Sequence, residues 1–234
     1  MKMLFVFLSF FALPQSFAQV SNAQIKGNFS EIAKLGRLQG GESLQSFSNN
    51  NVKGTRYFPE DWATGSITTN SGETIANGYV FLLDKQNQDL YVKEQNSSEV
   101  ILLGKDQVKR FTIGHHTFLE GSQMGGEPGT FYEQLAGKEN GIALYKLTKT
   151  IFIKANKQDI ERIKRGDFED EYKDDITYFI KTPTQLLKKI KLNENNLIKA
   201  LPTESKRIKE YFNTHQNNEV DQDFISALIN YLNV

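Results

Sequence analysis

The 234-residue chain contains no cysteine. This absence excludes disulfide bonds, a thiolate nucleophile and a zinc site built on thiolates. It also excludes lipid attachment through a cysteine that follows an export signal. A chain of this length does not need disulfides, because it can bury most of its apolar surface in one core. Length therefore predicts one domain, or one domain with an appendage.

An excess of charge of either sign is also missing. The 28 Lys and Arg residues balance 28 Asp and Glu, so the formal net charge is zero. It becomes about −1 if Lys2 is removed with an export signal. A neutral protein lacks the basic surface that binds polyanions, and we therefore expect no nucleic-acid binding.

Signatures of catalysis and of cofactor binding are absent as well. Residues 41–45 (GESLQ) resemble a nucleophile elbow except at the last position, where glycine is required. The glycine-rich stretch 121–129 has no Lys-Ser or Lys-Thr after it and opens no predicted helix, as a phosphate-binding loop would. A glycosidase pair is defined by the distance between two carboxyl groups, which a sequence does not contain. The sequence thus predicts no catalytic residue and no cofactor.

The first 18 residues have the form of an export signal. Lys2 supplies the positive start, residues 4–13 (LFVFLSFFAL) are apolar, and Pro14 ends the helix. Ser16 and Ala18 are the small residues that a signal peptidase requires. A retained membrane anchor is the alternative, but a spanning helix needs about 20 apolar residues. We expect an exported protein, periplasmic or associated with the cell surface, with no transmembrane segment after cleavage.

The next two parts of the chain differ in composition. Residues 19–53 are rich in Ser, Asn, Gln and Gly and predict a flexible polar leader. Residues 54–181 contain short runs of β-branched and aromatic residues between polar turns, which is typical of an antiparallel meander. The longest run, 142–153, loses its alternation near Tyr145, which predicts a bulge. The last strand is expected at residues 176–180.

Residues 182–234 change to a helical period and predict helices packed on the β domain. Thr182 as N-cap, Pro183 at the first helical position and Gln185 three residues after the cap predict the first helix. A second helix follows, and Asp221 caps a third whose apolar residues fall on one face. The predicted fold class is α+β: an antiparallel β-meander, sandwich- or barrel-like, followed by a small C-terminal helical segment.

Two groups of residues raise the question of a metal site. His115 and His116 are adjacent, and neighbours on a strand point to opposite faces, so they cannot bind one ion together without a bulge. Residues 167–175 place carboxylates as a calcium loop does, but Tyr172 and Tyr178 stand where that loop needs glycine and glutamate. We expect a solvated hairpin tip or loop there and no metal; an irregular calcium site is the alternative.

Several other features predict contact surfaces, among them the glycine-rich loop and the charged segment 156–175. Two aromatic residues near the start of the β domain could stack on a glycan, although such residues more often plug a core edge. A lysine-rich C-terminal face could meet an acidic partner or a lipid surface, although a solvated helical face is the ordinary explanation. The candidate interaction surface comprises Tyr57, Trp62, Met124, Lys188, Lys189 and Arg207.

Parts of the sequence are similar to a known group of proteins. Residues 54–58 (GTRYF), leading into Trp62, resemble the opening of small exported β-rich proteins of Bacteroidota, and residues 77–81 and 89–92 fit the strands that follow in that group. Residues 208–233 resemble their helical tail. The resemblance implies export and a β-rich architecture. That group has no established activity, so the resemblance implies no catalytic residue.

Export without a catalytic signature predicts a non-enzymatic envelope protein. We expect an accessory or scaffold subunit that binds another envelope or outer-membrane protein. A small-ligand or glycan-binding β domain is the alternative, with a hydrolase of unfamiliar type behind it. A pocket that holds Trp62 or several tyrosines would favour ligand binding, and a buried pair of carboxylates would favour catalysis.

Overall fold

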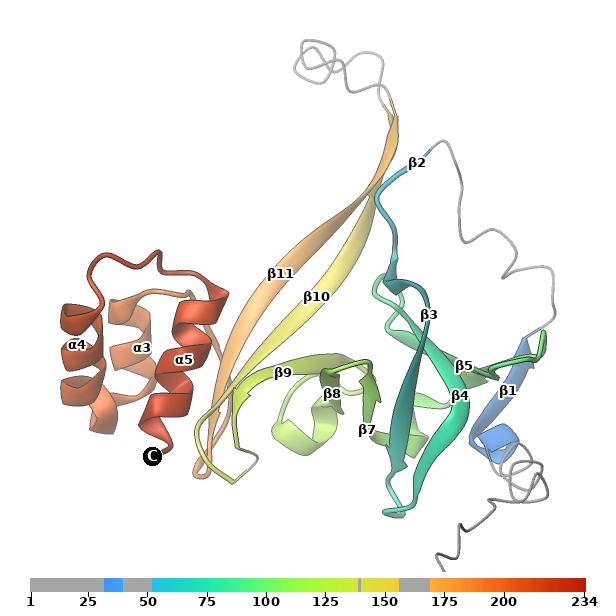
Figure 1. The fold of residues 1–234 in the computed structure, drawn as a ribbon, viewed down its shortest axis with the longest axis horizontal. Helices are drawn as coiled ribbons and strands as arrows, with labels where there is room; N and C mark the ends of the chain where they lie inside the picture. The colour runs from blue at the N-terminus through green and yellow to red at the C-terminus, as the bar shows by residue number, and fades with distance from the viewer. Residues whose placement is uncertain (1–31, 40–51, 139, 156–168) are drawn as a thin grey trace, which may run out of the picture.

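The computed structural model describes residues 32–39, 52–138, 140–155 and 169–234. Its strands form one sheet in the order β1-β6-β5-β4-β3-β7-β8-β9-β10-β11-β12, with β2 beside β11. Neighbours along this order are antiparallel, whereas β2 runs parallel to β11. Helices follow the last strand (Figure 1). The predicted α+β class and the antiparallel meander are confirmed, although the described sheet is single and does not close on itself.

The first eight strands contain most of the larger apolar core, which β3 to β8 supply. They are β1 (Gly36–Gln39), β2 (Val52–Lys53), β3 (Tyr57–Thr69), β4 (Thr74–Asp84), β5 (Asp89–Glu94), β6 (Val100–Leu103), β7 (Val108–Ile113) and β8 (His116–Glu120). Short 3-10 helices lie at η1 (Ala33–Leu35), η2 (Lys105–Gln107) and η3 (Gly121–Met124). Alternate residues point to one face, where Ile67, Phe81 and Phe111 are fully buried. Gly72, with a φ of 88°, allows the tight reversal from β3 to β4.

Strands β9 (Phe131–Gly137), β10 (Ala143–Ile153) and β11 (Asp170–Thr182) continue the sheet. The last two pair without a register shift and extend as a long two-stranded ribbon, drawn in yellow and orange (Figure 1). The predicted bulge is confirmed, because the pairing of β10 with β9 shifts between Leu144 and Tyr145. The predicted last strand, 176–180, is too short. Acidic residues from 170 to 175 belong to β11 rather than to a loop, and residues 156–168 lie outside the described part of the chain.

The helix predicted to begin at Thr182 is wrong. Residues Gln185–Ile190 form a strand, β12, which pairs with β11 through Tyr178 opposite Ile190. Pro183 lies in the turn between the two strands, where its fixed φ is as suitable as at a helix start. The stretch QLLKKI is compatible with the period of a helix and with that of a strand. The open edge of β11, which offers a ladder of hydrogen bonds, decides for the strand.

The C-terminal helices form the second core. They are α3 (Glu194–Ala200), α4 (Ser205–Thr214) and α5 (Gln222–Leu232), with η4 (Pro202–Glu204) between the first two. The predicted cap is confirmed: Asp221 accepts a hydrogen bond from the backbone N–H of Phe224 at 2.9 Å. The side-chain oxygens of Asn230 and Asn233 accept hydrogen bonds from Gly137 and Ile142, which fixes α5 to β9 and β10. The apolar stripe of α5 is Phe224, Ile225, Leu228, Ile229 and Leu232. None of the described helices is long and apolar enough to cross a membrane.

Part of the predicted polar leader belongs to the sheet. Ile32 is fully buried in the larger core, and β1 pairs with β6. Strand β2 pairs with the N-terminal end of β11. The ordered domain therefore begins before Gly54, where the sequence predicted its start. Residues 1–31 and 40–51, which include the predicted signal and the GESLQ stretch, lie outside the described part.

Candidate functional site

The turn between β4 and β5 is built around the buried carboxylate of Asp84. This carboxylate accepts hydrogen bonds from the backbone N–H groups of Gln86 at 2.9 Å and Asn87 at 3.2 Å. It also forms an ion pair with Arg56, on the segment that leads into β3. Burial by itself lowers the pKa of Arg56, but the hydrogen bond and the charge of Asp84 raise it above its ordinary value. These contacts hold the turn in one conformation. They thereby position Lys85 and Gln88 of the same turn.

Residues of this turn hold the middle of the ribbon. The carbonyl oxygen of Lys85 accepts a hydrogen bond from the N–H of Thr150 at 3.3 Å. The side-chain amide of Gln88 donates to the carbonyl of Thr148 at 3.1 Å. The ammonium group of Lys85 binds both carboxylate oxygens of Asp174, at 2.7 and 2.8 Å. The site thus lies where β4 and β5 meet β10 and β11.

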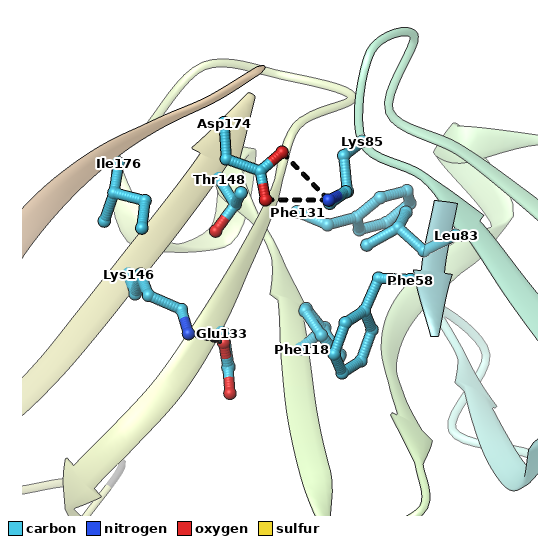
Figure 2. Close-up of a pocket in the computed structure, with 10 residues that line it drawn as sticks. All are labelled: Phe58, Leu83, Lys85, Phe118, Phe131, Glu133, Lys146, Thr148, Asp174 and Ile176. Atoms are coloured by element: carbon cyan, nitrogen blue, oxygen red, sulfur yellow. Dashed lines mark hydrogen bonds and ion pairs between the residues drawn. The ribbon is translucent and has the colours of Figure 1, made fainter. Parts of the chain in front are cut away.

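A cavity of about 130 Å³ opens at this junction. Leu83 and three phenylalanine rings line one side of it, and four side chains of the ribbon, three polar and one aliphatic, line the other (Figure 2). The ring of Phe58 lies 5.6 Å from that of Phe118, which stacks on Phe111 in the larger core. The lining residues are Phe58, Leu83, Lys85, Phe118, Phe131, Glu133, Lys146, Thr148, Asp174 and Ile176.

Glu133 is the second carboxylate in the cavity wall. One of its oxygens lies 2.6 Å from Nδ1 of His116 and the other 2.6 Å from Nζ of Lys146. The ring of Phe58 contacts His116 edge-on at 4.9 Å. Burial, together with the negative charge of Glu133, raises the pKa of the nearby Tyr178.

The charges in the cavity wall are balanced. Asp174 is paired with Lys85, and Glu133 with Lys146. Each of these two carboxylates therefore has a lysine ammonium as its partner within the wall. The arrangement provides an apolar compartment with a charge-balanced polar rim, a surface that suits the insertion of a neutral apolar group.

The aromatic residues of the predicted surface lie elsewhere. Tyr57 and Trp62 pack against a small cluster formed by Leu82, Tyr91 and Val100. The ammonium of Lys93 sits 4.8 Å from the centre of the Trp62 ring, and burial raises the pKa of Tyr57. Neither residue lines the cavity. Their position at a core edge agrees with the packing alternative rather than with a glycan platform.

The other predicted surface residues separate into two kinds. Met124 is only 2% exposed and packs beside Tyr132 and Tyr145, so its side chain is a core element. Arg207 donates hydrogen bonds to the last carbonyls of α5, from Tyr231 at 2.7 Å and Leu232 at 3.0 Å, which is a helix-end role. Lys188 and Lys189 are exposed, but on β12 rather than on a helix.

The histidines lie at two separate places in the structure. His115 lies in the turn before β8, its ring 4.1 Å from that of His116, which contacts Glu133. His215 stacks on Tyr211 at the end of α4. Among the described residues no group of three or more His, Asp or Glu side chains could hold a metal ion. Of the acidic segment, residues up to 168 are outside the description, and Asp174 is bound by Lys85.

None of the residues of the predicted interaction surface lines the cavity. The lining side chains come from six strands and a turn that are far apart in the chain, and the strand residues among them look ordinary in their own segments. One local signal existed. The DKQNQD stretch after the apolar run of β4 is a polar turn that contains a fully buried aspartate and a buried lysine.

Comparison with known proteins found no matching family model, no similar curated protein and no similar solved structure.

Proposed function

We propose that this protein is an exported, non-enzymatic binding protein that acts as an accessory or scaffold subunit of an envelope complex. The observation that carries the proposal is the concentration of exposed apolar side chains on the ribbon beside the cavity. Ile151, Phe152 and Ile176 are 51%, 43% and 48% exposed. Exposed apolar side chains gathered on one element are typical of a protein contact site.

The pairing register puts two of these side chains on the cavity face. Directly opposed residues of paired strands share a face, and Phe152 is opposite Tyr172 while Thr148 is opposite Ile176. Thr148 and Ile176 both line the cavity. A partner lying along this face would cover Phe152 and Ile176 and place one apolar side chain in the cavity. A buried central anchor of this kind usually supplies most of the binding energy of an interface.

The test is a pull-down of the tagged mature protein from gently solubilised envelopes of its own host, with bound proteins identified by mass spectrometry. Phe152→Ser and Ile176→Ser are expected to lower the recovered partner about tenfold or more, as loss of an interface anchor does. Leu38→Ser is the matched control. Leu38 is 65% exposed on β1, at the opposite end of the sheet, and this change should leave recovery unchanged.

Two outcomes would contradict the proposal. Equal recovery of one stoichiometric partner by all three variants would remove the ribbon face as the contact surface. A wild-type protein that recovers no partner would remove the scaffold role.

A small apolar ligand is the second candidate, favoured by the size of the cavity. Its volume of about 130 Å³ is close to that of engineered cavities of about 150 Å³ that bind benzene. Neither Trp62 nor any tyrosine is among the lining residues, so the cavity favours an apolar group over a sugar. Native mass spectrometry of protein purified from its own host would show the ligand as added mass. Thr148→Phe, which fills the cavity, should remove that mass.

A further inference from the structure

The outer edge of β11 has a gap in its pairing. At one end β2 pairs with Asp170 and Glu171, and at the other β12 begins its pairing at Tyr178. Between them, at residues 172–177, no strand of the described chain pairs with this edge. An unpaired edge is a ready site for another strand, and proteins normally cover or blunt such edges.

The direction of the backbone groups at this gap follows from contacts on the other side of the ribbon. The N–H of Thr150 donates to Lys85, and the carbonyl of Thr148 accepts from Gln88, so both residues point their backbone groups away from β11. Residues opposite them in an antiparallel ladder must then also point away from the partner strand. Those residues are Asp174 and Ile176, and the register between β10 and β11 has no shift.

A second contact agrees with this direction of the backbone groups. The carbonyl oxygen of Tyr172 faces the outer edge, because a Cβ added to Gly54, which follows β2, would lie 2.6 Å from it. Every second residue of this stretch, namely Tyr172, Asp174 and Ile176, thus points its N–H and C=O groups to the outer edge. Gly54 lies against Tyr172. The N–H and C=O groups of Asp174 and Ile176 remain for an added strand.

A groove of about 440 Å³ lies along this edge, where β12 ends and the chain turns toward α3. It is lined on one side by residues 175–178 of β11 and on the other by residues 189–192. The side chain of Ile176, which also lines the cavity, is half exposed within it. The groove lies next to the end of β12, whose pairing with β11 is antiparallel.

We propose that this gap accepts an extended segment of a partner protein as an added strand, antiparallel to β11, with a charge pattern set by Lys173 and Asp175. Both side chains are exposed, lie on one face of the ribbon, and have no ion-pair partner among the described residues. Tyr172 and Ile176 lie on the other face. The complementary segment reads, from its N-terminus, apolar, basic, any residue, acidic, so that its charges lie opposite Asp175 and Lys173. It ends before Tyr172, against which Gly54 already lies. This inference rests on the proposed function, since it names the kind of segment that the partner supplies.

A second copy of this chain does not fit the gap edge to edge. In such a pair the two β11 strands would face each other, and β2 and β12 of both copies would lie in the same narrow space between them. Neighbouring strands are about 4.8 Å apart, which leaves no room for these flanking strands. A single extended segment that enters between β2 and β12 avoids this collision.

The test is an amide NMR titration of the mature protein with two synthetic peptides at millimolar concentration. The matching peptide is acetyl-Val-Lys-Thr-Glu-amide, and the control has its Lys and Glu exchanged. The matching peptide should shift the amide signals of Asp174 and Ile176 but not that of Arg37 on β1, and it should bind about fivefold more tightly than the control. The double variant Lys173→Glu/Asp175→Lys should reverse this preference. Shifts confined to other residues, or equal binding of the two peptides, would overturn the inference.

The envelope pull-down separates this inference from the proposed function. Loss of the partner in the double charge variant supports both. If that variant recovers the partner as well as the wild type while Phe152→Ser loses it, the proposed function stands and the added strand is refuted. If no variant and no wild-type protein recovers a partner, the proposed function fails, and the peptide titration still decides whether the edge accepts a strand.

Discussion

Asp84→Ala is expected to destabilise the protein strongly, because it removes the centre of the turn that builds the site. The Asp84 side chain is 0% exposed, and that of its partner Arg56 is 25% exposed. The change leaves a largely buried guanidinium without its counter-ion and the N–H groups of Gln86 and Asn87 without their acceptor. Removing one partner of a buried ion pair costs about 3–5 kcal/mol. Since Arg56 keeps some access to water, we expect the lower end, about 3 kcal/mol.

Urea unfolding followed by circular dichroism measures this loss in the free energy of unfolding. The matched control is Asp89→Ala, on the other strand of the same hairpin and directly opposite Asp84. Asp89 pairs with Lys105 at 3.2 Å, and both side chains are partly exposed, so its loss should cost less than about 1 kcal/mol. Because the turn also holds the ribbon, the amide of Thr150 should exchange its hydrogen faster in Asp84→Ala only. A difference of less than about 0.5 kcal/mol between the two variants would refute the reasoning.

Three further predictions concern the edge, an ionisable group and a helix end. Ile176→Pro removes an N–H that points to the open edge, whereas Thr177→Pro removes an N–H that is hydrogen-bonded to β10. Urea unfolding should therefore show the Thr177→Pro variant to be less stable than the Ile176→Pro variant by about 2 kcal/mol. Burial, with the charge of Asp89, raises the pKa of Tyr91 to about 12. The contribution of the protonated Tyr91 phenol to stability is therefore full below pH of about 10, where the phenol of the unfolded chain begins to ionise, and is lost as the pH rises through about 12. Tyr91→Phe should abolish this loss of stability at alkaline pH, together with the matching step in an ultraviolet titration. Arg207→Ala should lower stability by about 1–2 kcal/mol in thermal unfolding, because two carbonyls at the end of α5 lose a charged donor, and an unchanged melting temperature would contradict that role.

The features that were predictable from the sequence depend on neighbours along the chain. The alternation of β10 predicted a long strand with a bulge near Tyr145, and the register shift lies at that point. The Asp221 cap and the apolar stripe of α5 were predicted for the same reason, because a cap and a helix face involve residues only three or four positions apart. The antiparallel meander also followed from short apolar runs between turns.

The prediction failed where a local pattern fits two structures. Thr182, Pro183 and Gln185 suit a helix start and also a hairpin turn, and the open edge of β11 selected the hairpin. Arg207 looked like part of a basic surface, yet it completes α5, whose end comes beside it only after folding. Met124 looked like a loop residue, but the chain folds its short 3-10 helix onto the core.

The sequence by itself determined the strand-rich architecture, the helical end, the lack of thiol chemistry and the balance of charge, because these are properties of composition and of short-range periodicity. Only the tertiary structure decided the site. The cavity needs Phe58, Glu133 and Asp174 in one place, and the open edge needs β2 and β12 to stop short of each other along β11. Both depend on strand pairings between distant segments, whose register is set by the packing of the whole sheet rather than by any neighbouring residues.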